Sequence, residues 1–206
     1  TSYYETSPIT YIGGSSGPPA IFAGSLNNLY KCLTSTNCDV DSKWAPVFTP
    51  PKDPVTGIAF DSANAALYIA TGGHTIEKCF ISTDCDNTSD WAVVYDTVSV
   101  SFWSIVYDPN TLAFYAGDEN GNIRRCATST GCDSGATDWK IVLNTDYLQV
   151  TNIVALTSTP GYSITEKALY ANIIESVFGN ASLVYRCEIS TGCDVSTEWV
   201  ISFNGV

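Results

Sequence analysis

All eight cysteines of the chain fall into one unit that occurs four times. Each unit has a basic residue, a cysteine, five further residues, a second cysteine followed at once by aspartate, and then a tryptophan. The pairs are Cys32 and Cys38, Cys79 and Cys85, Cys126 and Cys132, and Cys187 and Cys193. Successive first cysteines are 47, 47 and 61 residues apart. A period of this length is typical of propellers and solenoids, which are built from repeated supersecondary units.

The cysteine spacing also indicates the compartment of the protein. Pairs whose members are six residues apart can be local disulfides or metal clips. A structural zinc site usually needs four ligands, often including histidine, and His74 is the only histidine of the chain. We therefore predict four local disulfides and a secreted, extracellular protein. Two glycosylation sequons, which begin at Asn87 and Asn180, agree with secretion.

The net charge excludes several classes of partner. The chain has 21 acidic and 9 basic residues, and its formal net charge of −12 repels phosphate backbones and anionic lipid. We therefore expect no binding to nucleic acid. No apolar run approaches the roughly 18 residues that a membrane-spanning helix requires, so we expect no membrane insertion. The chain begins at Thr1 and contains no methionine, as expected for a mature polypeptide whose targeting peptide has been removed.

Each repeat contains four short apolar runs separated by Gly, Asp, Asn and Ser. In the second repeat they cover residues 55–61, 66–70, 75–82 and 91–95. Runs of this length, bounded by turn residues, predict β-strands, and no helical period persists for ten residues. The first, third and fourth repeats give the same series, at 9–13, 20–24, 28–35 and 44–48; at 102–108, 113–117, 122–129 and 139–143; and at 151–156, 168–171, 183–190 and 199–203. Longer connections, at 157–167 and 172–182, interrupt the fourth repeat.

Four units of this size cannot bury their own faces, so they must stack on one another. We predict an all-β fold, a β-propeller of four four-stranded blades that each contain one Cys-x5-Cys disulfide. The blades are expected at residues 8–50, 54–97, 100–146 and 149–206 of a single domain, with an arm at 1–7. A two-sheet sandwich with duplicated halves is the alternative.

The cysteine unit resembles the Asp-box of sialidase-type propeller repeats, in which Ser-x-Asp-x-Gly-x-x-Trp lies at the turn between the third and fourth strands. The matching residues are Ser35, Asp39 and Trp44; Ser82, Asp86 and Trp91; Ser129, Asp133 and Trp139; and Ser190, Asp194 and Trp199. Here the serine and the tryptophan are nine or ten residues apart rather than seven, and the glycine is out of register. The resemblance implies propeller topology only, because in that family the box lies away from the active site.

The aspartate after each second cysteine is expected to accept backbone N–H bonds within its own loop, as in an Asx turn. Calcium binding is the alternative, because other carboxylates lie near each of these aspartates. The nearby carboxylates are Asp41, Asp84, Asp90, Asp138 and Glu198. Their spacing differs between repeats, so we predict no metal site.

Two further recurring residues are expected to have structural roles. The tryptophans are predicted to pack between blades, with stacking on sugars as the alternative. The basic residue before each first cysteine is predicted to pair with a neighbouring carboxylate, such as the loop aspartate. A ring of charges that face a ligand is the alternative. These basic residues are Lys31, Lys78, Arg125 and Arg186.

The sequence contains no recognisable catalytic apparatus. A sialidase needs three arginines gathered at the propeller axis, whereas Arg124, Arg125 and Arg186 all lie on predicted third strands. A serine hydrolase would have to use His74, which adjoins a Gly-Gly turn and is predicted to be a loop residue. With all thiols assigned to disulfides, we predict no enzymatic activity and no cofactor.

Two binding functions remain open. The arm at residues 1–7 contains β-prone Tyr3 and Tyr4 and could add to a sheet edge of a second copy, which predicts head-to-tail self-assembly. The alternative is a lectin with glycan sites between blades and with Tyr30 and Tyr185 as stacking rings.

The insertions of the fourth repeat are a further candidate site for a protein or glycan partner. They contain Tyr162, Phe178 and the Asn180 sequon. Ordinary variation of loop length is the alternative explanation.

Overall fold

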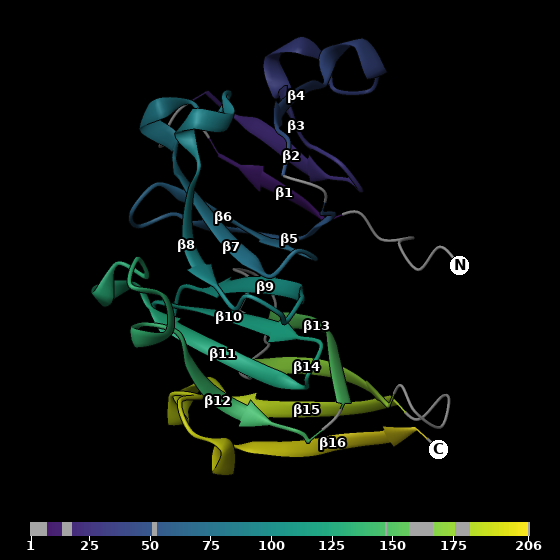
Figure 1. Ribbon diagram of the computed structural model, residues 1–206, viewed down its shortest axis with the longest axis vertical. Helices are drawn as coiled ribbons and strands as arrows, with labels where there is room; N and C mark the ends of the chain where they lie inside the picture. Colours follow the sequence, from purple (N-terminus) through teal and green to yellow (C-terminus); the bar gives the residue numbers. More distant parts are fainter. Residues whose placement is uncertain are drawn as a thin grey trace. The chain divides into compact units, whose positions relative to one another are not determined.

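The computed structural model describes residues 8–13, 18–50, 53–146, 148–156, 167–175 and 182–205. These residues form four antiparallel sheets of four strands each (Figure 1). Each sheet runs in chain order from its first to its fourth strand. The prediction of an all-β fold with four four-stranded repeats is therefore confirmed, and we call the sheets blades 1 to 4. The described residues contain no helix apart from 3-10 turns of three residues, and no helix among them is long and apolar enough to cross a membrane.

The strands lie as follows. Blade 1 contains β1 (Ile9–Ile12), β2 (Ala20–Gly24), β3 (Leu29–Leu33) and β4 (Ala45–Phe48), and blade 2 contains β5 (Val55–Asp61), β6 (Ala66–Thr71), β7 (Thr75–Phe80) and β8 (Ala92–Asp96). Blade 3 contains β9 (Phe102–Asp108), β10 (Ala113–Asp118), β11 (Asn122–Ala127) and β12 (Lys140–Asn144), and blade 4 contains β13 (Leu148–Leu156), β14 (Ala168–Glu175), β15 (Ser182–Glu188) and β16 (Trp199–Gly205).

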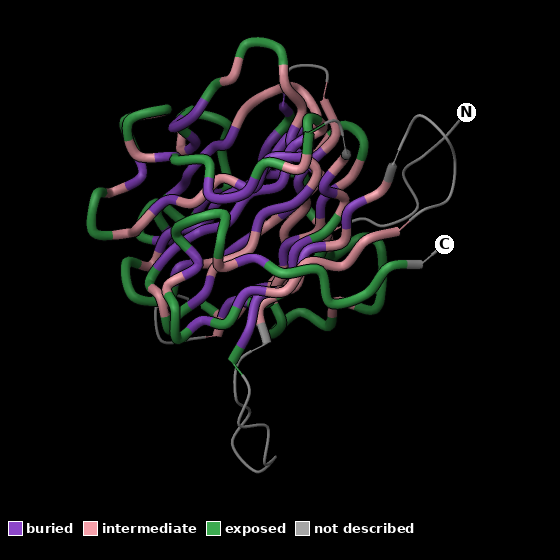
Figure 2. Tube along the Cα trace, turned by 90° about the horizontal axis from the view of Figure 1, so that it is seen from below, coloured by how far each residue is buried: buried purple, intermediate pink, exposed green. Residues whose placement is uncertain are grey.

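The chain divides into two compact units, Thr1–Phe102 and Trp103–Val206. In the first unit, β5 of blade 2 lies against β1 and β2 of blade 1, and the two blades share one apolar core. In the second unit, β13 of blade 4 lies against β10 and β11 of blade 3, and these blades share another core. Among the described residues, most buried positions lie on the strands and most loop positions are exposed (Figure 2).

Within each unit, the earlier blade presents one face to the later blade. We call this its trailing face, and we call the face that receives it the leading face of the later blade. In the first unit, Phe22, Leu29 and Phe48 of the trailing face of blade 1 meet Leu67, Ile69 and Trp91 of the leading face of blade 2. In the second unit, Tyr115, Ile123 and Leu143 of blade 3 meet Leu169, Ala171 and Trp199 of blade 4.

A glycine on the second strand lets the next blade approach closely. A Cβ atom at Gly24 would lie 2.8 Å from Cγ1 of Val55, and one at Gly117 would lie 2.4 Å from Cγ1 of Val150. Gly24 and Gly117 occupy the same position in blades 1 and 3, and each valine belongs to the following blade of the same unit. Glycine is required at these positions because any side chain would displace the neighbouring strand.

The third strands end two residues earlier than the sequence predicts, and a 3-10 turn follows each of them. In every repeat, the threonine hydroxyl of the Ser-Thr pair donates a hydrogen bond to a backbone carbonyl three residues earlier. The donors are Thr36, Thr83, Thr130 and Thr191, with distances of 2.7, 2.7, 2.9 and 2.7 Å. This local bond competes with strand pairing and turns the chain into the cysteine loop.

Blade 4 has longer strands than expected. Residues 172–175 were predicted to belong to a connection, but they extend β14 to Glu175 and pair with β13 and β15. The first strand begins at Leu148 rather than at residue 151. Part of the insertion therefore lengthens the sheet, because the β-branched residues Ile173 and Ile174 favour a strand and pair with β13 and β15 on both sides.

The turn between the first and second strands depends on a buried aspartate that the sequence prediction treated only as a turn signal. In blade 3, the carboxylate of Asp108 accepts the backbone N–H groups of Asn110 at 3.1 Å and Thr111 at 3.0 Å, and the hydroxyl of Thr111 at 2.6 Å. Asp61 accepts the backbone N–H groups of the same turn in blade 2. Both side chains are almost fully buried.

We therefore expect Asp108→Ala to destabilise the protein by about 1–3 kcal/mol, because the part-buried donors of this turn lose their acceptor. Urea unfolding monitored by tryptophan fluorescence measures this change. The control is Asp194→Ala, which removes an exposed carboxylate from the same unit and should leave the unfolding midpoint almost unchanged. Equal midpoints for the two variants would contradict the role of the turn.

Candidate functional site

The four predicted disulfides are present. Cys32–Cys38, Cys79–Cys85, Cys126–Cys132 and Cys187–Cys193 are each bonded, and no cysteine is free. Each bridge fastens the end of a third strand to the loop that leads to the fourth strand. Closing so short a loop contributes about 2 kcal/mol in the chain-entropy description. The cysteine loop is thus a rigid feature on every blade.

The residue before each second cysteine has a left-handed backbone. The φ angles are 65° at Asn37, 66° at Asp84, 82° at Gly131 and 100° at Gly192. Asn, Asp and Gly are the residues that tolerate this conformation best. At Asp84 and Gly192, the carbonyl accepts a hydrogen bond from the preceding blade of the same unit.

The prediction for the basic residues is wrong for Lys31 and Arg125. The Lys31 ammonium donates to the backbone carbonyl of Asp84 in blade 2 and lies 5.7 Å from the ring centroid of Phe22. The guanidinium of Arg125 donates from Nε to the hydroxyl of Tyr115 at 3.2 Å. Both cations therefore use an aromatic neighbour on the second strand, and neither uses the loop aspartate.

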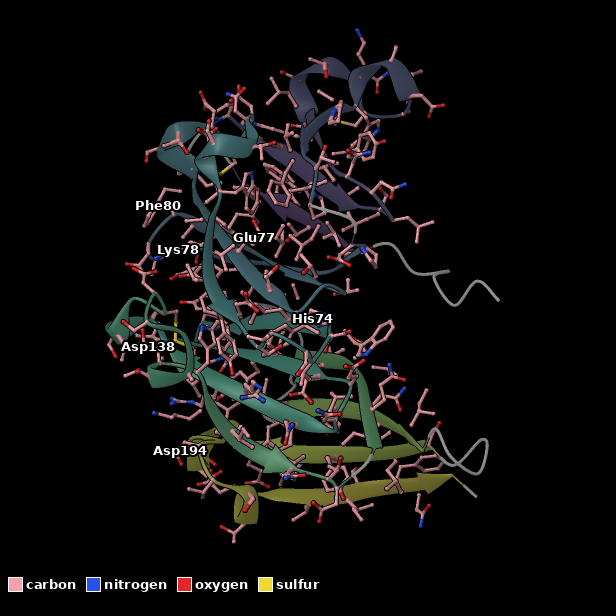
Figure 3. All side chains as sticks on the ribbon, viewed as in Figure 1. His74, Glu77, Lys78, Phe80, Asp138 and Asp194 are labelled. Carbon is pink, nitrogen blue, oxygen red and sulfur yellow. A yellow bond between two sulfur atoms is a disulfide. The ribbon has the colours of Figure 1, made fainter. Side chains whose placement is uncertain are left out.

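Of the other two basic residues, Lys78 also lies beside aromatic rings, whereas Arg186 pairs with a carboxylate. Lys78 lies 5.5 Å from the ring centroid of Tyr68 and 4.6 Å from that of Phe80, a cation–π geometry. Figure 3 marks Lys78 and Phe80. Arg186 does contact a carboxylate, with 2.9 Å between Nη2 and Oε1, but the partner is Glu188 on its own strand.

Tyr115 links blades 3 and 4 through its hydroxyl. The hydroxyl donates to the carbonyl of Gly192 at 3.1 Å and accepts from Arg125. Burial raises the pKa of the phenol above its usual value, and the bonds to Thr111 and Arg125 oppose that shift. The hydroxyl therefore stays protonated and can donate at physiological pH.

We expect Tyr115→Phe to lower the free energy of unfolding by about 1–3 kcal/mol, because the part-buried bond to Gly192 is lost while the ring is kept. Thermal and urea unfolding test this expectation. The matched control is Tyr185→Phe, which changes a half-buried tyrosine of the same unit. A Tyr115→Phe protein as stable as the control would show that the hydroxyl does not hold the two blades together.

The predicted role of the loop aspartates as backbone acceptors is wrong for Asp86 and Asp194. The backbone N–H groups of the loop are accepted by the carboxylate just before the tryptophan: Asp90 accepts from Asn87 at 3.1 Å, Asp138 from Ser134 at 2.9 Å, and Glu198 from Asp194 at 2.9 Å. Asp39, Asp86, Asp133 and Asp194 are exposed, and Asp86 accepts a side-chain bond from Asn87 at 2.6 Å. Figure 3 shows Asp138 and Asp194 in their loops.

Two groups of residues considered from the sequence, the carboxylates near the loops and the arginines, do not form clusters in the described residues. Over the described ranges, no three His, Cys, Asp or Glu side chains converge on a possible metal ion. The arginines do not gather at one place, since Arg124 pairs with Asp118 at 3.1 Å, Arg125 with Tyr115 and Arg186 with Glu188. His74 lies in the turn between β6 and β7, as predicted, and its Nδ1 has no hydrogen-bond partner (Figure 3).

The predicted packing of tryptophans between blades is confirmed within each unit. The ring centroid of Trp91 lies 5.2 Å from that of Phe48 in blade 1, and the centroid of Trp199 lies 6.5 Å from that of Tyr115 in blade 3. Trp91 and Trp199 are 8% and 5% exposed. These buried rings cannot serve as platforms for sugars.

One position of the third strand is not the same in all four blades. Tyr30 and Tyr185 occupy it in blades 1 and 4 and are half-buried, while Glu77 and Arg124 occupy it in blades 2 and 3. Glu77 is only 5% exposed (Figure 3). The Thr75 hydroxyl donates to its Oε1 at 3.2 Å. The tyrosine is therefore present in two of the four blades, and in both it is half-buried.

Burial raises the pKa of the Glu77 carboxyl above its ordinary value of 4.5, and the bond from Thr75 only partly opposes the shift. The folded protein therefore binds this proton more tightly than the unfolded chain does. The resulting stabilisation is complete below pH 4.5 and is lost as the pH rises through the raised pKa.

We therefore expect Glu77→Gln to be more stable than the wild type at pH 7.5 and to approach it below pH 4.5. Melting temperatures across this pH range measure the difference. The control is Glu188→Gln, which removes the same charge from a carboxylate that is exposed and should not show the same pH dependence. A constant difference between Glu77→Gln and the wild type would contradict the assignment.

The remaining predicted sites lie partly outside the described residues. Asn87 is exposed in the cysteine loop of blade 2, where its amide donates to Asp86. Glycosylation at Asn87 stays a prediction. Tyr3, Tyr4, Tyr162, Phe178 and Asn180 lie outside the described residues.

Large apolar side chains are exposed on the fourth strands. Val93 on β8, Ile141 on β12 and Ile201 on β16 occupy one equivalent position and are 57%, 50% and 54% exposed. Val200 and Phe203 add exposures of 52% and 59% on β16. These strands end their sheets, so each has one backbone edge without a strand partner in its own sheet. The sequence analysis did not predict this surface, because it assigned the fourth strands a role in the sheets and no role in binding.

Comparisons with known proteins show the fold. No protein-family model matches the chain, and no curated protein matches it. Solved structures do match, in 413 chains, and one of them comes from the crystal structure of a nidogen/laminin complex. That likeness has a TM-score of 0.60 at 11% identity and covers 90% of this chain and 61% of the other. The chain thus spans about three fifths of the length of this neighbour.

The likeness confirms the predicted fold class, since the disulfide-bearing four-stranded sheets correspond to blades of the propeller fold seen in nidogen. The resemblance to Asp-box repeats holds at this level of topology only. At 11% identity, the fold carries no function with it.

Proposed function

We propose that this chain is a non-enzymatic, extracellular interaction module that binds protein at the open edge of a blade. Support comes from the four disulfides, which belong to an oxidising compartment, and from the arginines, which are engaged in structural contacts. The neighbour solved in a nidogen/laminin complex supports a protein partner. One observation carries the proposal: the composition and exposure of β16.

Proteins usually protect a sheet edge with charge or proline, because an unprotected edge can accept another strand. The outer strand β4 contains Pro46, β8 ends in Asp96 and β12 begins with Lys140. By contrast, β16 (WVISFNG) contains neither a charge nor a proline and exposes Val200, Ile201 and Phe203. Of the four outer strands, β16 is therefore best suited to accept an added strand.

The arm at residues 1–7 of a second copy is the proposed occupant of this edge. Its sequence TSYYETS contains two β-prone tyrosines and one acidic residue. Donation of an arm from one copy to the edge of the next joins two different surfaces, which leads to head-to-tail assembly. The protein would then serve as the repeating part of an extracellular structure.

A peptide of residues 1–7 tests this proposal when it is titrated into a chain that lacks those residues. We expect saturable binding by calorimetry, and a lower mass by light scattering for the shortened chain than for the full chain. The control peptide carries Tyr3→Ala and Tyr4→Ala, and the control protein carries Ile201→Lys on the edge. Both should bind more weakly. No binding, together with equal masses for the full and shortened chains, would refute the role of the arm.

A further inference from the structure

The outer strand of blade 2 is a sheet edge with little protection. Its sequence in β8 is AVVYD, and the only charge is Asp96 at the last residue. Val93, near the start of the strand, is 57% exposed. Proteins usually guard an edge with charge, proline or a covering segment, because an unguarded edge can pair with a strand of another chain. The residues of β8 themselves provide little of this protection.

The cysteine loop that leads into β8 contains a glycosylation sequon, Asn87-Thr88-Ser89. The other three cysteine loops have no sequon. The residues in the place of Asn87, two positions after the second cysteine, are Val40 in blade 1, Ser134 in blade 3 and Val195 in blade 4. The outer strands of blades 1 and 3 contain a proline and a lysine, respectively. The sequon therefore belongs to a blade whose outer strand has neither.

Hydrogen bonds fold this loop so that Asn87 lies beside the residues that enter β8. The backbone N–H of Asn87 donates to the carboxylate of Asp90 at 3.1 Å, and the backbone N–H of Asp90 donates to the carbonyl of Asn87 at 3.0 Å. The N–H of Trp91 donates to the carbonyl of Thr88 at 3.3 Å. Since β8 begins at Ala92, directly after Trp91, a group attached to Asn87 is held near the first residues of the strand.

The two polar atoms of the Asn87 side chain have different tasks. The oxygen caps the 3-10 turn Thr88–Asp90 by accepting the backbone N–H of Asp90. The nitrogen, Nδ2, donates to the exposed carboxylate of the neighbouring Asp86 at 2.6 Å. An N-linked glycan is attached at Nδ2 and leaves the oxygen in place. A modified Asn87 can therefore still cap the turn that positions it.

We propose that Asn87 carries an N-linked glycan, and that this glycan covers the start of β8 and prevents the strand from accepting a strand of another chain. The inference rests on the proposed extracellular location, because the donor is a lipid diphosphate-linked oligosaccharide of the secretory pathway. In the transfer, Nδ2 forms a bond to C1 of the first sugar and the bond from C1 to the diphosphate oxygen breaks. Nδ2 releases one proton to solvent, and the lipid diphosphate leaves.

Blade 4 provides the contrast. Its outer strand β16 is also apolar, but Val195 stands in the place of Asn87, so no glycan is attached at this position of the loop before β16. An oligosaccharide is bulky and hydrated, and a strand that paired along β8 would have to displace it. The glycan therefore distinguishes two apolar edges and directs strand addition to β16.

Mass spectrometry of the chain secreted from a eukaryotic host tests the modification. In peptides that cover the loop, we expect a glycan on Asn87 in the wild type and in Thr88→Ala, which keeps the sequon, and no glycan in Ser89→Ala, which destroys it. Both variants keep Asn87 and its cap. An unmodified Asn87 in the secreted wild type would overturn the inference alone, whereas a chain that is not secreted would also refute the proposed extracellular location.

Light scattering tests the protection of the edge, in a chain that carries Ile201→Lys so that strand addition at β16 is blocked. We expect this chain to stay monomeric while it is glycosylated. Its mass should rise with concentration when Ser89→Ala is added or when the glycan is removed enzymatically from the folded protein. Addition of Val93→Lys, which places a charge on β8, should restore the monomer. A chain that stays monomeric without the glycan, or that associates despite Val93→Lys, would overturn the role of the glycan at this edge.

Discussion

The burial of one blade face against the next is the interaction on which this structure depends. A four-stranded sheet of this size exposes apolar side chains on both sides, and only a neighbouring sheet removes them from water. Within each unit the outer strand of the earlier blade meets the second strand and the tryptophan of the later one, as Phe48 meets Leu67 and Trp91. Gly24 and Gly117 add the close approach that this packing needs.

The cysteine loop explains why a cation, two cysteines and a tryptophan recur together. The bridge holds the loop, the left-handed residue before the second cysteine directs its carbonyl outward, and the preceding blade donates to it through Lys31 or Tyr115. The tryptophan at the end of the loop meets an aromatic ring of that blade, Phe48 or Tyr115. The repeated residues thus form one joint between the two blades of each unit.

The strands and the disulfides could be predicted because their signals are local: apolar runs, turn residues and pairs of cysteines within seven positions. The partners of Lys31 and Tyr115 could not, because Asp84 and Gly192 lie 53 and 77 residues further along the chain. The sequence does not distinguish Asp90, Asp138 and Glu198 as backbone acceptors from calcium ligands, because carboxylates serve in both roles. The extension of β14 could not be predicted, because residues 172–175 become part of the strand only through pairing with β13 and β15.

The placement of the disulfides affects how such a protein folds and how it can evolve. Every bridge joins residues six positions apart in a single blade, so all eight cysteines are satisfied without any link between blades. Oxidation therefore imposes no order of folding, since each hairpin can lock as soon as it has formed. Duplication or deletion of one repeat can also add or remove a whole blade without leaving a thiol unmatched.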